Sequence, residues 1–206
     1  MKRRSFITNV AALAAATCIR LPGQTLSNGV RLARAARTQL GVTRAYDPNW
    51  ATLPYPGGDV SRSTGVCADV VIRAARDGLH LDLQQLVHED MVGNFDLYPA
   101  HSTWGSLAPN SSVDHRRILN LETYWRRVGA ELWHATEPVA GDAFPLHLAV
   151  GDIVTWLLNG RVPHIGVIVS SAPTHAIHNN GKGAEESPLS YFHAHNASAH
   201  YRWPRA

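Results

Sequence analysis

The chain of 206 residues has little cysteine, and this scarcity limits its chemistry. Only Cys18 and Cys67 are present, and Cys18 lies in a segment that predicts a removable export signal. The remaining thiol has no partner for an internal disulfide, which excludes a disulfide-stapled fold. In an exported protein, such a cysteine is a buried hydrophobe, an intermolecular partner or a nucleophile.

Long apolar runs are also scarce. A basic cluster at residues 2–4 precedes an apolar stretch at residues 6–19, which is too short to span a bilayer and has the length of a signal-peptide core. Residues 3–7 resemble the twin-arginine export motif. We expect residues 1–26 to be an export signal and residues 27–206 to form one periplasmic domain without a transmembrane segment. The residues before Cys18 match a lipoprotein signal poorly.

The positive charge of the chain belongs mostly to this signal. Removing residues 1–26 takes away four basic residues and no acid, so the formal charge falls from +3 to −1. The basic isoelectric point therefore gives no reason to expect nucleic acid or a membrane surface as a partner.

The first half of the mature chain predicts helices. Apolar positions recur at helical spacing over residues 27–40 and again after Asp82, which is suited to cap that helix. A loop rich in proline and glycine fills residues 41–64. Residues 96–118 look irregular, Asn120 is expected to cap a short helix, and residues 130–149 look like a loop.

The second half changes to strand-like patterns. Apolar runs at residues 150–158 and 162–169 flank Asn159-Gly160, a strong hairpin signal, and Pro163 must then lie at a strand start or an edge. Short strands are also expected at residues 175–178 and 200–203. Helices followed by an antiparallel sheet make an α+β fold.

Cys67 is placed as a nucleophile would be. A serine or threonine suited to cap a helix precedes it, followed by a glycine, and a helical pattern that ends near Gly78 comes after it. The helix N-terminus predicts a lowered pKa for the thiol. A thiol also needs a base, which His164 offers at the start of a strand, and His178 or Asn179 on the next strand could orient it.

The order of these motifs resembles the papain-like cell-wall peptidases of the NlpC type. The matching pieces are a cysteine at a helix start, Gly151-Asp152-Ile153-Val154, His164-Ile165-Gly166-Val167 and Ile177-His178. The resemblance implies a papain-like fold, with the cysteine helix packed on a C-terminal antiparallel sheet, and a Cys67, His164, His178 triad. The chain departs from that family at the nucleophile, where Val66-Cys67-Ala68-Asp69 replaces Asp-Cys-Ser-Gly, and in a long insert before Gly151.

A second resemblance covers most of the mature chain. The sequence is similar to a bacterial family of YijF-like proteins with a domain of unknown function. The shared pieces are Tyr46-Asp47-Pro48, Tyr55-Pro56-Gly57-Gly58-Asp59, Gly65-Val66-Cys67, Val87-His88-Glu89-Asp90-Met91, Asp114-His115-Arg116-Arg117 and Pro163-His164-Ile165-Gly166. This resemblance implies a family and supplies no substrate.

Other polar residues are candidates for binding. Tyr46 is either a core residue or an oxyanion donor beside the Cys67 backbone N–H, and Tyr55 competes for that role. The run His115, Arg116, Arg117 either binds a substrate carboxylate or forms a surface loop with a local ion pair. Asp69 is expected to pair with Arg73 one helical turn away.

We expect no metal and no cofactor. The run His88-Glu89-Asp90 lacks the His-Glu-x-x-His spacing of a zinc site, and adjacent residues on a helix point in different directions.

The sequence therefore predicts an exported cysteine hydrolase that cleaves an amide bond, with peptidoglycan peptides or a related cell-envelope amide as substrate. Two alternatives stay open. One is an acyltransferase or esterase on the same scaffold, which apolar walls around Cys67 would favour. The other is a non-enzymatic envelope-binding protein, which a buried Cys67 or a cleft filled by residues 79–149 would favour.

Overall fold

The second half of the chain forms the sheet that carries part of the site. The computed structural model describes residues 26–205, so the expected signal at residues 1–26 lies almost entirely outside them. The strands follow the order β3-β8-β4-β5-β6-β7, each antiparallel to its neighbour. Their bounds are β3 Glu131–Ala140, β4 Ile153–Leu158, β5 Val162–Ser171, β6 Thr174–Asn179, β7 Ala184–Pro188 and β8 Asn196–Tyr201.

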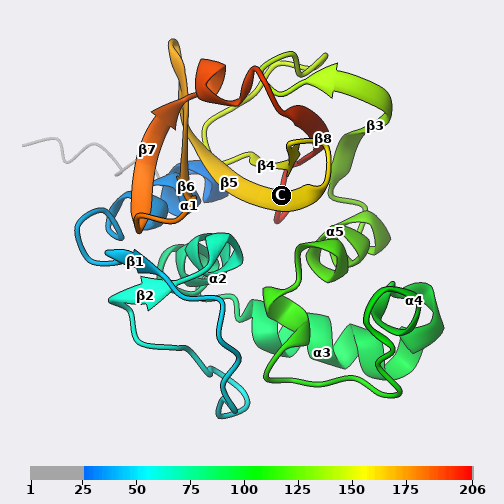
Figure 1. Cartoon of the computed structure of the whole chain (residues 1–206). Helices are drawn as coiled ribbons and strands as arrows, with labels where there is room; N and C mark the ends of the chain where they lie inside the picture. Colours follow the sequence, from blue (N-terminus) through cyan, green and yellow to red (C-terminus); the bar gives the residue numbers. More distant parts are fainter. Residues whose placement is uncertain (1–25, 206) are drawn as a thin grey trace, which may run out of the picture.

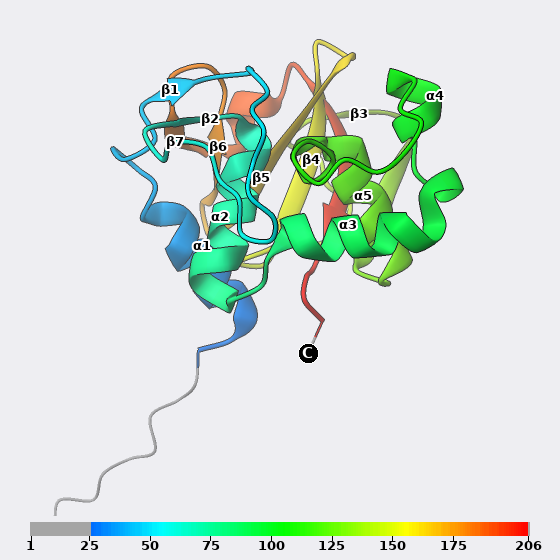
Figure 2. The same ribbon diagram turned by 90° about the horizontal axis from the view of Figure 1, so that it is seen from below.

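Helices from the first half cover one face of this sheet (Figures 1 and 2). Helices α1, α2 and α5 contact β5, and α3 packs on α2 and α5. The bounds are α1 Asn28–Arg37, α2 Cys67–Leu79, α3 Leu83–Asn94, α4 Ala100–Trp104 and α5 Ile118–Arg127, with short 3₁₀ helices η1 Phe95–Leu97, η2 Asp114–Arg116 and η3 Leu189–Phe192. The expected α+β order is confirmed. None of the helices in residues 26–205 is long and apolar enough to cross a membrane.

The hairpin between β4 and β5 forms where Asn-Gly predicted it. Asn159 and Gly160 both have positive φ, which this residue pair tolerates, and the strands pair from Ile153↔Val167 to Leu158↔Val162. Pro163 is the second residue of β5, ahead of the part that pairs with β6. Its missing N–H therefore costs no ladder bond on the β6 side.

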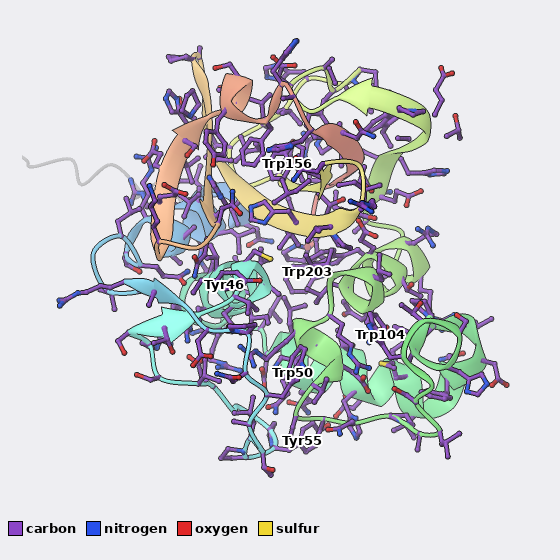
Figure 3. The ribbon with its side chains drawn as sticks, viewed as in Figure 1. Tyr46, Trp50, Tyr55, Trp104, Trp156 and Trp203 are labelled. Atoms are coloured by element: carbon purple, nitrogen blue, oxygen red, sulfur yellow. The ribbon has the colours of Figure 1, made fainter. Side chains whose placement is uncertain are left out.

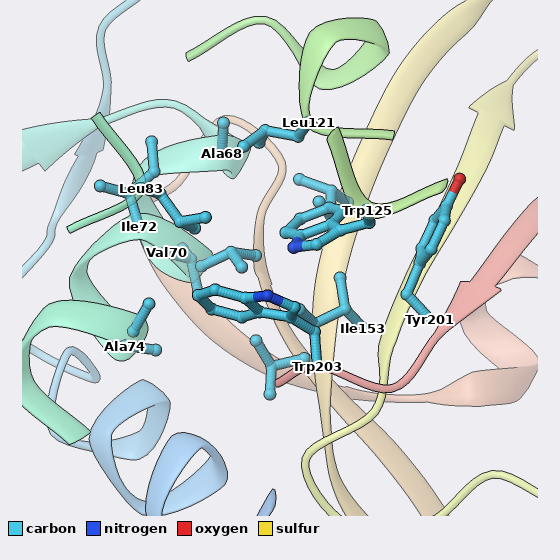
Figure 4. Close-up of a cluster of buried hydrophobic side chains, with 14 of the residues drawn as sticks. Ala68, Val70, Ile72, Ala74, Leu83, Leu121, Trp125, Ile153, Tyr201 and Trp203 are labelled. Atoms are coloured by element: carbon cyan, nitrogen blue, oxygen red, sulfur yellow. The ribbon is translucent and has the colours of Figure 1, made fainter. Parts of the chain in front are cut away.

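The main core lies between the helices and the sheet. Trp125 and Trp203 are buried there beside Tyr201, with aromatic centroids 5.3–6.4 Å apart. Figure 4 shows these rings among side chains from α2, α3 and β4. A second cluster, which includes Trp156 stacked on Phe192 at 3.9 Å, packs apart from the main core. The sheet thus packs against two separate apolar clusters, and β5 lies between them.

Several local expectations were wrong. Residues 130–149 contain β3, an edge strand with mostly half-exposed or exposed residues, so the usual alternation of apolar and polar residues is weak. Asn120 is buried inside α5 and does not cap it. Helix α2 ends at Leu79, close to the expected Gly78, but this glycine does not cap it; a Cβ there would lie 2.7 Å from the Arg31 carbonyl oxygen, so its role is close packing of α2 on α1.

A two-stranded parallel sheet fixes the position at which the chain enters α2. It pairs β1, Ala45–Tyr46, with β2, Thr64–Gly65, and holds the ends of the 41–64 loop together. Because β2 ends one residue before the N-cap of α2, this pairing fixes where that helix begins.

Candidate active site

Cys67 is the first residue of α2 and is 5% exposed. The N-cap is Val66, and its side chain makes no capping hydrogen bond, so the expected serine or threonine cap is wrong. Asp69 supplies the cap instead, because its Oδ2 accepts a hydrogen bond from the Val66 N–H at 2.7 Å. Within residues 26–205, Cys67 is the free cysteine.

An ion pair buried behind the thiol holds this cap in place. Arg116 donates from Nε to Asp69 Oδ1 and from Nη2 to Asp69 Oδ2, both at 2.8 Å. Asp69 therefore does not pair with Arg73, which binds Asp59 at 2.9 Å. The expected pairing along the helix was wrong, because a partner from η2 satisfies both oxygens of the carboxylate in the dry interior.

The thiol pKa departs from the value expected for a helix N-terminus. Burial raises the pKa of Cys67 to about 12, and the Asp69 charge adds to the rise. Hydrogen bonds from the backbone N–H groups of Ile165, Ala68 and Cys67 itself oppose it. The expected lowering is wrong because desolvation of the thiolate outweighs these donors. The bond from Ile165 also places the sulfur beside the start of β5, one residue from His164.

His164 lies on β5 and is linked through β6 to β7. Its Nε2 lies 3.1 Å from His178 Nδ1, and His178 Nε2 lies 3.0 Å from Ser187 Oγ. All three side chains are buried. Ser187 was not expected, because β7 itself was not predicted from the sequence.

Both histidines are neutral near pH 7. Burial, with His178 close by, lowers the pKa of His164 to about 3, and burial lowers that of His178 to about 4. With a thiol pKa of about 12, the resting site holds a thiol and a neutral imidazole and not an ion pair.

Asn179 has a structural position and does not contact the His164 ring. Its Nδ2 donates to the Gly65 carbonyl oxygen at 2.8 Å, and its Oδ1 accepts from the Gly181 and Gly183 N–H groups. It thus ties the end of β6 to the turn before Cys67. Of the two candidates for the third group, His178 is the one hydrogen-bonded to His164.

Tyr46 and Tyr55 lie in different places. Tyr46 lines the cavity beside Cys67, and burial together with the nearby Cys67 raises its pKa to about 12, so its hydroxyl keeps its proton. Tyr55 is 41% exposed and packs edge-on against His88 with centroids 4.9 Å apart. Figure 3 shows Tyr55 well away from Tyr46, so only Tyr46 is near the thiol.

The cavity beside Cys67 has a volume of about 270 Å³. Arg116 and Arg117 line it together with Trp50 and Trp104. His115 does not line it; this ring is 2% exposed, and burial lowers its pKa to about 4.

His164 opens onto a neighbouring cavity of about 140 Å³. Tyr46 and Pro163 line both cavities and so form the partition between them. In residues 26–205, no hydrogen bond joins the Cys67 thiol to His164; a base can be poorly aligned with its nucleophile until substrate is bound. The same residues contain no group of three His, Cys, Asp or Glu side chains arranged to hold a metal ion.

Comparison with known proteins identifies the family of this chain and solved structures with a similar fold. The family model described as "Domain of unknown function (DUF1287)" matches residues 33–203. The uncharacterized protein YijF of Escherichia coli strain K12 is 42% identical over 167 residues, which cover 79% of this chain and 77% of that protein.

Solved structures are similar at lower identity. An N-acetylmuramoyl-L-alanine amidase from Bacteroides uniformis superposes with a TM-score of 0.50 at 13% identity, covering 83% of this chain and 98% of that chain. NlpC1 from Trichomonas vaginalis superposes with a TM-score of 0.45 at 14% identity, covering 88% of this chain. This chain spans about half, 46%, of the length of that second structure. The α+β fold is therefore one that a solved amidase also has.

Proposed function

We propose that this chain, which belongs to the DUF1287 family, is an exported cysteine hydrolase that cleaves an amide bond of the cell envelope, with peptidoglycan peptides as the substrate class. The observation that carries the proposal is the chain of hydrogen bonds His164–His178–Ser187, which begins one residue from the backbone donor that contacts the Cys67 sulfur. A thiol, a base and a group that orients the base are the parts that acyl transfer needs.

The mechanism uses one of the two protonation patterns that these contacts permit. In it His178 Nε2–H donates to Ser187 Oγ, and His178 Nδ1 accepts from His164 Nε2–H. The lone pair of His164 is then on Nδ1. That nitrogen takes the thiol proton while the Cys67 sulfur attacks the carbonyl carbon.

The proton then moves to the leaving group. The His164 imidazolium gives it to the departing amine, and the acyl group stays on Cys67 as a thioester. Water, deprotonated by the same Nδ1, hydrolyses the thioester and restores the thiol. Because His164 is a weak base with a pKa of about 3, transfer is concerted with attack and no stable thiolate accumulates.

Donors for the tetrahedral oxyanion are available at the start of α2. The Cys67 and Ala68 N–H groups both face the sulfur. The Tyr46 hydroxyl, protonated at neutral pH, is the side-chain donor. Tyr46→Phe should lower kcat by about 100- to 1,000-fold with little change in fold, since removing one donor of an oxyanion site costs on that order.

The substrate class rests on two supports outside the relay. The sequence predicts export, which places the enzyme beside peptidoglycan, and the solved amidase of similar fold is named for a peptidoglycan bond. The apolar walls of the cavity, including Ile118 and Pro163, keep an acyltransferase or esterase on the same scaffold as the alternative. Burial of Cys67, with Arg116 and Arg117 from the 79–149 insert beside it, is the observation that favours a binding protein.

The test is mass spectrometry of purified peptidoglycan and soluble muropeptides after incubation with the protein. We expect new fragments with the native chain and none with Cys67→Ala or His164→Ala. His134→Ala is the matched control, because that exposed ring pairs with Glu131 on the edge strand β3, and it should leave the fragments unchanged.

The remaining outcomes separate the alternatives. Absence of fragments together with hydrolysis of thioesters or esters that requires Cys67 would favour the acyltransferase or esterase. Absence of any turnover with measurable muropeptide binding would contradict a hydrolase and favour the binding protein.

A further inference from the structure

The cavity beside Cys67 has a wall of positive charge that no acid inside it balances. Among the described residues that line it are two arginines, Arg116 and Arg117, and no aspartate or glutamate. The carboxylates that pair with them, Asp69 and Asp114, lie behind the wall and outside the lining. An uncharged acyl chain would accept no hydrogen bond from these two guanidiniums.

Each guanidinium also has an N–H that is not used. Asp69 occupies Nε and Nη2 of Arg116, and the buried Nη1 has no hydrogen-bond partner among residues 26–205. Arg116 as a whole is only 4% exposed. Buried donors without an acceptor are rare in folded proteins, so this N–H, on a residue that lines the cavity, is a donor available to an acceptor there.

The Arg117 guanidinium has only a long contact with a carboxylate but packs closely against aromatic rings. Its Nη1 donates to Ser106 Oγ at 3.2 Å and lies 3.5 Å from Asp114 Oδ1, while its buried Nε has no partner in the described part of the chain. The Trp104 and Trp50 rings lie 4.2 and 5.9 Å from its guanidinium carbon. Burial lowers its pKa, and Asp114 opposes this only in part.

The free edge of Arg117 has the shape that binds a carboxylate. With Nη1 used, Nε and Nη2 remain as two parallel donors, the arrangement that a carboxylate accepts in a fork. Trp50 is 52% exposed and its ring lies over both guanidiniums, at 5.2 Å from Arg116 and 5.9 Å from Arg117; Figure 3 shows where this side chain lies. Because Nε of Arg117 is buried, a carboxylate reaches this edge only when a covering side chain moves aside.

We propose that Arg117, with Arg116 Nη1 as a second donor, is a specificity-determining residue that binds a carboxylate of the substrate beside the scissile bond. This rests on the proposed function, and it narrows the substrate class to peptides with a free carboxylate close to the bond that is cut. Neutral acyl chains and amidated peptides are then poor ligands.

The first measurement is binding, which does not depend on turnover. Cys67→Ala protein is titrated calorimetrically with soluble muropeptides and with the same muropeptides after conversion of their free carboxyl groups to methylamides. We expect the free acids to bind about 10- to 100-fold more tightly, the range for a charge-assisted hydrogen bond pair.

The variants assign this preference to Arg117. Arg117→Met in the same background should bring the two affinities together, and Arg117→Lys should restore part of the difference, because lysine keeps the charge and loses the fork. Arg62→Met is the matched control, since Arg62 pairs with Asp77 on the surface and is far from the cavity lining. Circular dichroism checks that each variant is folded.

The outcomes distinguish this inference from the proposed function. Equal binding of acids and methylamides by the Cys67→Ala protein, or a preference that survives Arg117→Met, overturns the carboxylate site even if the native enzyme cuts peptidoglycan. A preference that depends on Arg117 supports the site even if no cleavage is found, in which case the hydrolase proposal fails alone.

Discussion

The buried pair of Asp69 and Arg116 supports the start of α2, which carries Cys67, and its removal should lower stability. The two side chains are 4% and 1% exposed and are joined by two hydrogen bonds of 2.8 Å. Arg116→Met leaves a buried carboxylate without its partner. Removing one partner of such a pair typically costs about 3–5 kcal/mol.

Urea unfolding measures this cost. With a slope of about 2 kcal/mol per M for a chain of this size, the midpoint should fall by about 2 M. The double variant Asp69→Asn/Arg116→Met removes both charges, and the asparagine can still accept from the Val66 N–H. It should therefore be more stable than the sum of the two single changes predicts, with a coupling of about 1–3 kcal/mol.

A small effect would refute this reasoning. If Arg116→Met lowers stability by less than about 1 kcal/mol and the double variant shows no coupling, the pair is not a desolvated one and does not hold the start of α2. Arg62→Met is the control at an exposed pair, 47% exposed at the arginine, and should cost about 0–1 kcal/mol.

Three further predictions follow from the same site. Burial lowers the pKa of His164 to about 3 and of His178 to about 4. Their neutral rings therefore contribute stability that is full above about pH 6.5 and is lost as pH falls toward 4. Between pH 7 and 4.5 the urea midpoint should drop less in His178→Gln than in the native chain. Alkylation of Cys67 by iodoacetamide should accelerate about tenfold per pH unit from pH 7 to 10, and a plateau below pH 8 would contradict the raised thiol pKa of about 12. Gly65→Ala should destabilise by about 1–3 kcal/mol in urea, since its Cβ would lie 2.9 Å from an oxygen of the buried carboxylate, whereas Gly93→Ala, with open space around it, should be neutral or stabilising.

The parts of the fold that sequence could predict are those with strong local chemistry. Asp82 caps its helix, and Asn159-Gly160 forms the hairpin, because each of these residues acts on its own backbone neighbours. The edge strands β3 and β7 were not predicted. Each is paired on one side only and is largely outside the core, so neither carries a hydrophobic period that a sequence pattern could reveal.

The parts of the site that sequence could not predict depend on contacts between distant segments. Asp69 lies one helical turn from Arg73, yet it pairs with Arg116, 47 residues away. Asn179 and His178 are adjacent and polar, and only the fold decides that one ties down the turn before Cys67 and the other reaches His164. The order of the motifs along the sequence indicates which segments form the site. Tertiary packing decides which side chains pair within it.

The thiol shows most clearly why position alone cannot fix chemistry. A helix N-terminus stabilises a thiolate by at most a few kcal/mol, and this holds when water or a cation also solvates the sulfur. Cys67 is 5% exposed, the nearby charge of Asp69 is negative, and the Arg116 guanidinium is already paired with that carboxylate. Desolvation therefore exceeds the helix contribution, and the proton stays on sulfur. In the proposed mechanism the substrate carbonyl takes up the electron pair as His164 takes the proton, so the dry surroundings of Cys67 favour reaction with bound substrate over reaction with passing oxidants or disulfides.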